Sequence, residues 1–145
     1  PALPAGYTHK ARIGSVRTDS TVNKYPRPFV QAGNQVRYRV VAGSSVTGNG
    51  IEVMSGTFPK WTAIGVSAFV PPTAVAIVGA VYNVYNFDVA VAPNNAWDRG
   101  AACVYTPSGY GSYIQQFKML LESTNIYGYL QSGGFIYCQG WEDNL

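Results

Sequence analysis

Charged residues are scarce in this chain of 145 amino acids. Aspartate, glutamate, lysine and arginine make up only 12% of it, well below the level usual in soluble domains. Nucleic-acid-binding domains cluster their basic residues, and the net charge of +3 comes with no such cluster. The sequence therefore predicts no binding to nucleic acid. Many basic residues instead alternate with apolar ones, as on the solvent face of strands: Lys10, Arg12, Arg17, Arg37 and Arg39.

Histidine and cysteine, the usual carriers of acid–base and nucleophilic chemistry, are almost absent. The single histidine, His9, shares a predicted strand face with apolar residues and is interpreted as structural. Two cysteines and one histidine without paired spacing do not make a zinc site. Cys103 and Cys138 both lie in apolar runs, so we expect buried free thiols, with a disulfide as the alternative.

Other signs of catalysis are missing as well. The seven acidic residues are dispersed, which disfavours a calcium site, and no phosphate-binding or dinucleotide fingerprint is present. We predict no catalytic residue, no metal and no cofactor. Two carboxylates that meet in the fold would suffice for cleaving a glycosidic bond, so a small polysaccharide-cleaving enzyme stays as an alternative.

Long hydrophobic runs are also lacking. The longest weakly polar stretch, residues 63–82, is interrupted by Pro71 and Pro72, which predicts no membrane insertion. The first ten residues lack the charged start and apolar core of a secretory signal, so we expect none there.

Strand signals fill the chain instead. Apolar and polar residues alternate in short segments, and turn residues separate these segments at intervals of roughly 8–12 residues. This spacing indicates a single all-β domain over residues 1–145, an antiparallel sandwich. Residues 113–123 fit either a strand or a helix, and we expect a strand. The other expected strands are 7–19, 25–31, 35–41, 51–58, 61–70, two within 74–92, and 101–106.

The segment "IYGYLQSGGFIYC", residues 126–138, predicts a hairpin that turns at Ser-Gly-Gly. Both of its arms are apolar on both faces, whereas antiparallel strands with one face in water alternate. One face would pack on the opposite sheet, and a second copy of the molecule would cover the other. The alternative is a closed barrel whose own loops cover that face. The predicted subunit interface is Tyr127, Tyr129, Phe135, Tyr137 and Trp141.

Two polar loops combine aromatic rings with amide and charged groups, which is the combination that sugar sites use. They cover residues 93–100 and 107–112. The alternative is that Trp97 packs against the end of the barrel and that the two asparagines cap a turn. The predicted ligand-binding residues are Asn94, Asn95, Trp97, Asp98, Arg99 and Tyr110.

The two ends of the chain carry a resemblance. "LPAGYTHKARIGSVRTD" and "FIYCQGWEDN" resemble the bounding strands of bacteriophage virion domains. The inferred architecture is similar to the trimeric jelly-roll knobs, related in fold to tumour necrosis factor, at the tips of tail needles and fibres. This resemblance implies an antiparallel jelly-roll sandwich, a homotrimer and a location in the virion. It also implies contacts with other virion proteins and with a host surface glycan or receptor.

These observations together predict a non-catalytic structural and adhesion domain, a trimeric knob that contacts the host surface or caps the tail. The first alternative is a capsid-decorating or neck protein that binds only other virion subunits. The second is the small polysaccharide-cleaving enzyme.

Overall fold

The computed structural model describes residues 16–18, 26–40, 47–84, 87–96, 104–106 and 111–144. This part of the chain is all β and contains no α-helix, and every strand pair in it is antiparallel, which confirms the predicted fold class at this level. The elements are β1 (Phe29–Ala32), β2 (Gln35–Tyr38), β3 (Ile51–Gly65), the 3₁₀ turn η1 (Val66–Ala68), β4 (Ala74–Asn83), β5 (Val89–Ala92), β6 (Val104–Thr106), β7 (Tyr113–Leu120) and β8 (Asn125–Asp143).

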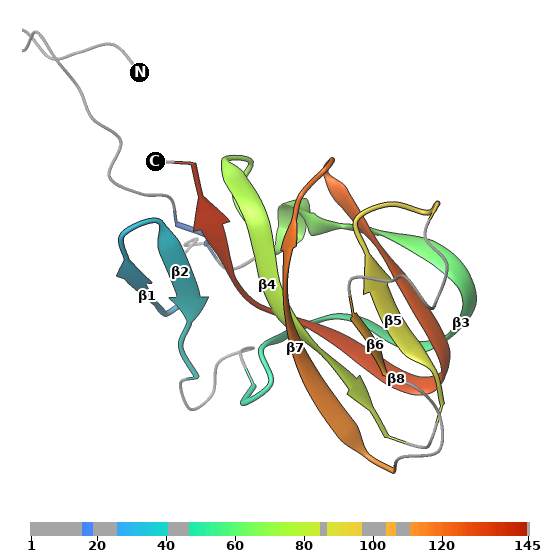
Figure 1. Ribbon diagram of the computed structural model, residues 1–145. Helices are drawn as coiled ribbons and strands as arrows, with labels where there is room; N and C mark the ends of the chain where they lie inside the picture. Colours follow the sequence, from blue (N-terminus) through green and yellow to red (C-terminus); the bar gives the residue numbers. More distant parts are fainter. Residues whose placement is uncertain are drawn as a thin grey trace, which may run out of the picture.

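The last strand, β8, is the centre of the sheet (Figure 1). Along one of its edges it pairs first with β3 and then, near its C-terminal end, with β2. Along the other edge it pairs with β5 and then with β4. The remaining strands extend these pairs: β1 on β2, β7 on β4 and β6 on β5. Nearly every position of β8 is therefore hydrogen-bonded within a ladder.

The hairpin prediction for residues 126–138 is wrong, because these residues belong to one continuous strand of 19 residues. Gly133 has a φ of 60°, so the Ser-Gly-Gly signal produces a bend within the strand instead of a reversal of the chain. β3 makes a long ladder with β8 on both sides of this bend, and that ladder takes the place of pairing between the two arms.

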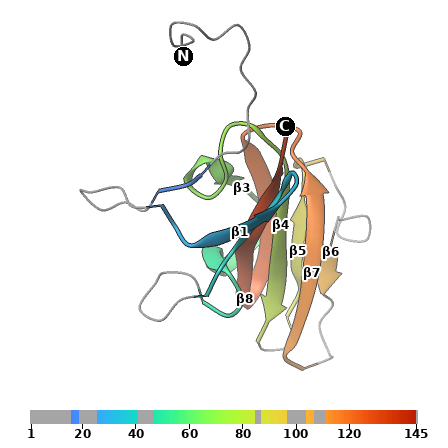
Figure 2. The ribbon, with the colours of Figure 1, turned by 90° about the vertical axis from the view of Figure 1, so that its left-hand side faces the viewer.

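The bend folds β8 over itself. A Cβ atom added to Gly128 would lie 2.7 Å from Cδ1 of Ile136 and 2.5 Å from Sδ of Met54, so the two halves of the strand face each other closely. The first half lies in a layer with β5 and β6, and the second half lies in a layer with β4 and β7. Both long strands curve round the same side of the fold, at the right in Figure 1. In Figure 2, β6 lies beside β7, where the two layers meet again.

The space between the layers holds the hydrophobic core. One cluster of buried side chains joins residues from β2 through β8, and its largest fully buried member is Trp141. The ring of Trp141 meets the ring of Tyr38 edge-on, with their centroids 5.5 Å apart. The inner face of β8 thus finds its cover within the same chain.

Residues 113–123 confirm the strand prediction over 113–120. Phe117 and Met119 are buried, whereas Gln116 and Lys118 are exposed and Lys118 forms an ion pair with Glu142. The expected pair of strands within residues 74–92 is likewise present as β4 and β5. The two strands expected at 51–58 and 61–70 form instead the single strand β3, which ends at Gly65.

Candidate binding surfaces

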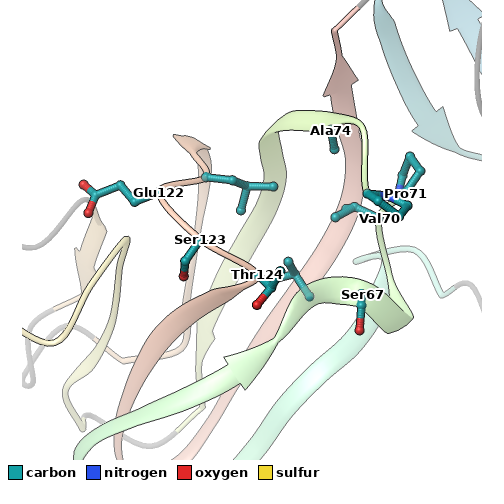
Figure 3. A pocket seen from close by; sticks show the side chains of 10 residues that line it. Ser67, Val70, Pro71, Ala74, Glu122, Ser123 and Thr124 are labelled. Carbon is teal, nitrogen blue, oxygen red and sulfur yellow. The ribbon is translucent and has the colours of Figure 1, made fainter.

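A pocket of about 300 Å³ opens at the end of the fold where β3 ends and β8 begins. Val70, Pro71 and Ala74 lie on one side of it, and Ser123 and Thr124 lie on the other (Figure 3). The carboxylate of Glu122 points away from the hollow in this view. The pocket therefore offers an apolar interior with hydroxyl groups at its rim.

Backbone hydrogen bonds hold the walls of this pocket in place. The N–H of Val66 donates to the carbonyl of Thr124 over 3.0 Å, which ties η1 to the turn before β8. The N–H of Leu121 donates to the carbonyl of Val75 over 2.9 Å, and the N–H of Ala74 closes a turn onto Pro71. The proline pair keeps residues 71–73 out of the sheet and leaves the gap that the pocket occupies.

Asn94, one of the predicted ligand-binding residues, lies beside this pocket. Its Nδ2 donates to Oε2 of Glu122 over 2.8 Å, and its Oδ1 accepts the N–H of Ala96 over 3.0 Å. Asn94 thus caps its own turn and also connects the 93–96 loop to the pocket rim. Asn95 is exposed on the same loop. Trp97, Asp98, Arg99 and Tyr110 lie outside the described residues.

The groups available for chemistry are few in the part of the chain that the structure describes. Within those ranges, no three side chains of histidine, cysteine, aspartate or glutamate gather as a metal site. Burial raises the pKa of the Cys138 thiol to about 12, so this thiol is neutral and unreactive at physiological pH. His9 lies outside the described residues. No helix in the described ranges is long and apolar enough to cross a membrane.

The five predicted interface residues differ in their exposure. Tyr127, Tyr129 and Phe135 are partly exposed on the outer face of β8. Tyr137 lies on the same face but only 8% of its surface is exposed. The prediction for Trp141 needs correction, because this side chain is fully buried in the core of its own chain and offers no surface to a second copy.

The outer aromatic residues of β8 form two separate patches. In the first aromatic patch, which we define as Trp61, Tyr127 and Tyr129, the rings of Trp61 and Tyr129 lie 6.1 Å apart between their centroids. The two tyrosines stand opposite Ala92 and Ala90 of β5, which are themselves fully buried, and both tyrosines are partly exposed.

The second aromatic patch, which we define as Tyr82, Ile114, Phe135 and Tyr137, lies on the other half of β8 and crosses β4 and β7. The Phe135 ring lies 6.1 Å from that of Tyr82 and 5.9 Å from that of Tyr137, and both pairs are nearly parallel, at 24° and 15°. Ile114 pairs with Tyr82 in the ladder and is 45% exposed. The patch therefore presents a row of large apolar groups on the outside of the sheet.

One carboxylate, that of Glu52, lies near Tyr137. Burial raises the pKa of the Tyr137 hydroxyl, a hydrogen bond with the side chain of Asn49 lowers it, and the nearby Glu52 carboxylate raises it further. Glu52 stands opposite Tyr137 in the β3–β8 ladder and accepts a hydrogen bond of 2.6 Å from the Ser55 hydroxyl. The second patch thus carries a carboxylate at its margin.

Reasoning from the sequence missed Trp61, Tyr82 and Ile114. Each lies in a segment that was read as an ordinary strand, and nothing local marks these three residues as neighbours of β8. Only the ladders β3–β8, β4–β8 and β4–β7 bring them beside its aromatic residues.

Comparison with known proteins adds no assignment. No protein-family model matches this chain, and neither a curated protein nor a solved structure is significantly similar to it.

Proposed function

We propose that this chain is a non-catalytic structural and adhesion domain of a virion, which works as a homotrimeric knob of jelly-roll type. Its role is to contact the host surface or to cap the tail. The observation that carries the proposal is the pair of aromatic patches that remain partly exposed on the outer faces of the sheet.

Large aromatic side chains dominate the energetics of protein interfaces, because each removes much apolar surface from water. Soluble monomers rarely expose contiguous apolar patches of this kind. In this chain the low content of charged residues gives few groups that would keep such patches apart in solution. We therefore propose that these patches mediate contacts between copies of the chain.

The pocket beside Asn94 supports the adhesive part of the proposal. It combines an apolar interior with hydroxyl groups from Ser67, Ser123 and Thr124, and loops form its rim. Loops at the rim of a pocket commonly bind ligands, because their sequences can change without disturbing the sheet. A host surface glycan or receptor group is the ligand that we propose for this end of the fold.

Light scattering on the purified protein tests the assembly. We expect a mass three times that of the chain, and a monomer at micromolar concentration would overturn the proposal. A glycan array then tests host contact: binding that is lost in Asn94→Ala supports adhesion. Absence of binding together with a position on the capsid shell in images of the virion would favour the decorating protein. Hydrolysis of a bound glycan that Asp98→Asn abolishes would favour the enzyme.

A further inference from the structure

Arg17 and Arg27 stand opposite each other in a short antiparallel bridge. Thr18 pairs with Pro26 in this bridge, and the N–H of Arg27 donates to the carbonyl of Arg17 over 2.8 Å. Residues that lie directly opposite in antiparallel strands have their side chains on the same face, about 5 Å apart at the Cβ atoms. Like charges in such positions repel each other, so this pair of arginines is unfavourable by itself.

Arg27 also continues the register of β1 and β2. The carbonyl of Pro28 accepts the N–H of Arg39 over 2.9 Å. This bond extends by one residue the ladder in which Phe29 pairs with Tyr38. Side chains alternate along a strand, so Arg27 shares a face with Phe29 and not with Pro28. That face is turned toward the core, because Tyr38 belongs to the core cluster and Phe29 packs against it.

The guanidinium groups of the two arginines carry buried donors that nothing uses. The Nε of Arg17 and the Nε and Nη1 of Arg27 are buried, and none has a hydrogen-bond partner within the described residues. Neither arginine forms an ion pair in that part of the chain. Burial raises the pKa of the Tyr38 hydroxyl, whereas the charges of Arg27 and Arg17 lower it, so both cations lie near this hydroxyl. Buried charge without a partner is costly, which leaves a need for an anion at this place.

We propose that Arg17 and Arg27 together bind a phosphate group, either as the free ion or as the phosphate monoester of a sugar. A phosphate between the two side chains would compensate both charges and accept hydrogen bonds from the buried N–H groups. Near neutral pH a phosphate group carries close to two negative charges, which match two cations better than the single charge of a carboxylate does. The residues that line the pocket beside Asn94 do not belong to this site, and the proposal does not depend on the trimer.

Isothermal titration calorimetry with inorganic phosphate at pH 8, in chloride buffer of constant ionic strength, tests the site. We expect the wild type to bind one phosphate per chain, and Arg17→Gln and Arg27→Gln each to bind it about tenfold more weakly or worse. Arg39→Gln is the matched control, because it removes the same charge from an exposed arginine. No saturable binding to the wild type, or equal weakening in Arg39→Gln, would overturn the proposal. Acetate that binds as tightly as phosphate would also contradict it.

Thermal stability gives a second measurement. Arg27→Met keeps most of the length of the side chain but removes its charge and its donors. In chloride buffer we expect its Tm to equal or exceed that of the wild type, because the substitution removes the repulsion between the two cations. Phosphate should raise the Tm of the wild type more than that of Arg27→Met. This difference cancels the general stabilisation that phosphate gives to folded proteins. A lower Tm for Arg27→Met in chloride, or an equal gain for both proteins, would overturn the proposal.

A hexose 6-phosphate distinguishes the two sources of the phosphate group. If it binds about tenfold more tightly than inorganic phosphate, the site recognises a sugar phosphate, and equal affinity identifies the free ion. Either result supports the site when Arg17→Gln and Arg27→Gln lose the binding, and sugar phosphate binding that survives in both variants would overturn it. Failure here leaves the proposed function untouched, since light scattering and the glycan array test that function separately.

Discussion

At the scale of single residues, Gly128 is where the two halves of β8 come closest. A methyl group there would lie 2.5 Å from Sδ of Met54 and 2.7 Å from Cδ1 of Ile136, so the layers would have to move apart. We expect Gly128→Ala to lower the free energy of unfolding by about 1–3 kcal/mol, as overpacked cores do. Urea denaturation measures this loss.

Gly48→Ala is the matched control for this substitution. A methyl group on Gly48 meets nothing within 4 Å, so the free energy of unfolding should change by about 0.5 kcal/mol or less. Equal effects of the two substitutions would contradict the close packing of the layers.

The second prediction at this scale concerns pH. Burial raises the pKa of the Tyr38 hydroxyl, and it raises the pKa of the Cys138 thiol to about 12. The folded state therefore favours the protonated form of both groups. Their contribution to stability is therefore complete below the unfolded-state pKa of the thiol, about 9, and is lost as the pH rises from there toward 12.

We expect the free energy of unfolding to fall between pH 9 and pH 11 by roughly one kcal/mol per pH unit for each group that titrates. Cys138→Ala should make this fall less steep, because it removes one of the groups whose pKa burial raises. Urea denaturation at a series of pH values measures both slopes, and identical slopes for the wild type and Cys138→Ala would contradict the prediction.

At the scale of elements, the continuity of β8 decides the architecture. Ala63 and Tyr127 are partners in the β3–β8 ladder, and paired residues in antiparallel strands lie within the range that a disulfide can bridge. We expect Ala63→Cys with Tyr127→Cys to form a disulfide in a Cys103→Ser background. Mass spectrometry of the non-reduced protein detects it.

The contrasting pair is Tyr129→Cys with Tyr137→Cys. A hairpin closed by Ser132–Gly134 would place these two residues side by side, whereas in the continuous strand they point out of opposite layers. Free thiols should therefore persist in this pair. A disulfide in the second pair and none in the first would contradict the continuous strand and support the predicted hairpin.

At the scale of the whole molecule, assembly should be visible in thermal stability. A protein that unfolds from an oligomer gains stability with concentration, because association draws the equilibrium toward the folded state. We expect Tm to rise by a few degrees for a tenfold increase in protein concentration. Tyr129→Ser should show no such rise. A wild-type Tm that is independent of concentration would contradict a trimer held by the two patches.

The sequence determined much of this protein through short-range patterns. Alternation predicted a strand in residues 113–123, which is present over 113–120, and turn residues divided 74–92 into two strands. The low content of charged residues predicted surfaces that need cover, which stays a prediction. Asn94 was predicted to bind a ligand from its loop alone; its side chain hydrogen-bonds Glu122 beside the pocket, and ligand binding there stays a prediction. These features are local, because they depend on residues only a few positions apart.

Only the tertiary structure decided the path of residues 125–143. A Ser-Gly-Gly segment is compatible with a reversal and with a bend, and the partner strands made the choice: β3 and β4 lie far away in the sequence and pair with both edges of β8. The same ladders placed Trp141 in the core and brought Trp61 and Tyr82 to the outer faces. The many backbone hydrogen bonds to distant strands stabilise the extended path more than a local turn preference stabilises a reversal. No short segment of the sequence specifies which distant strands will pair.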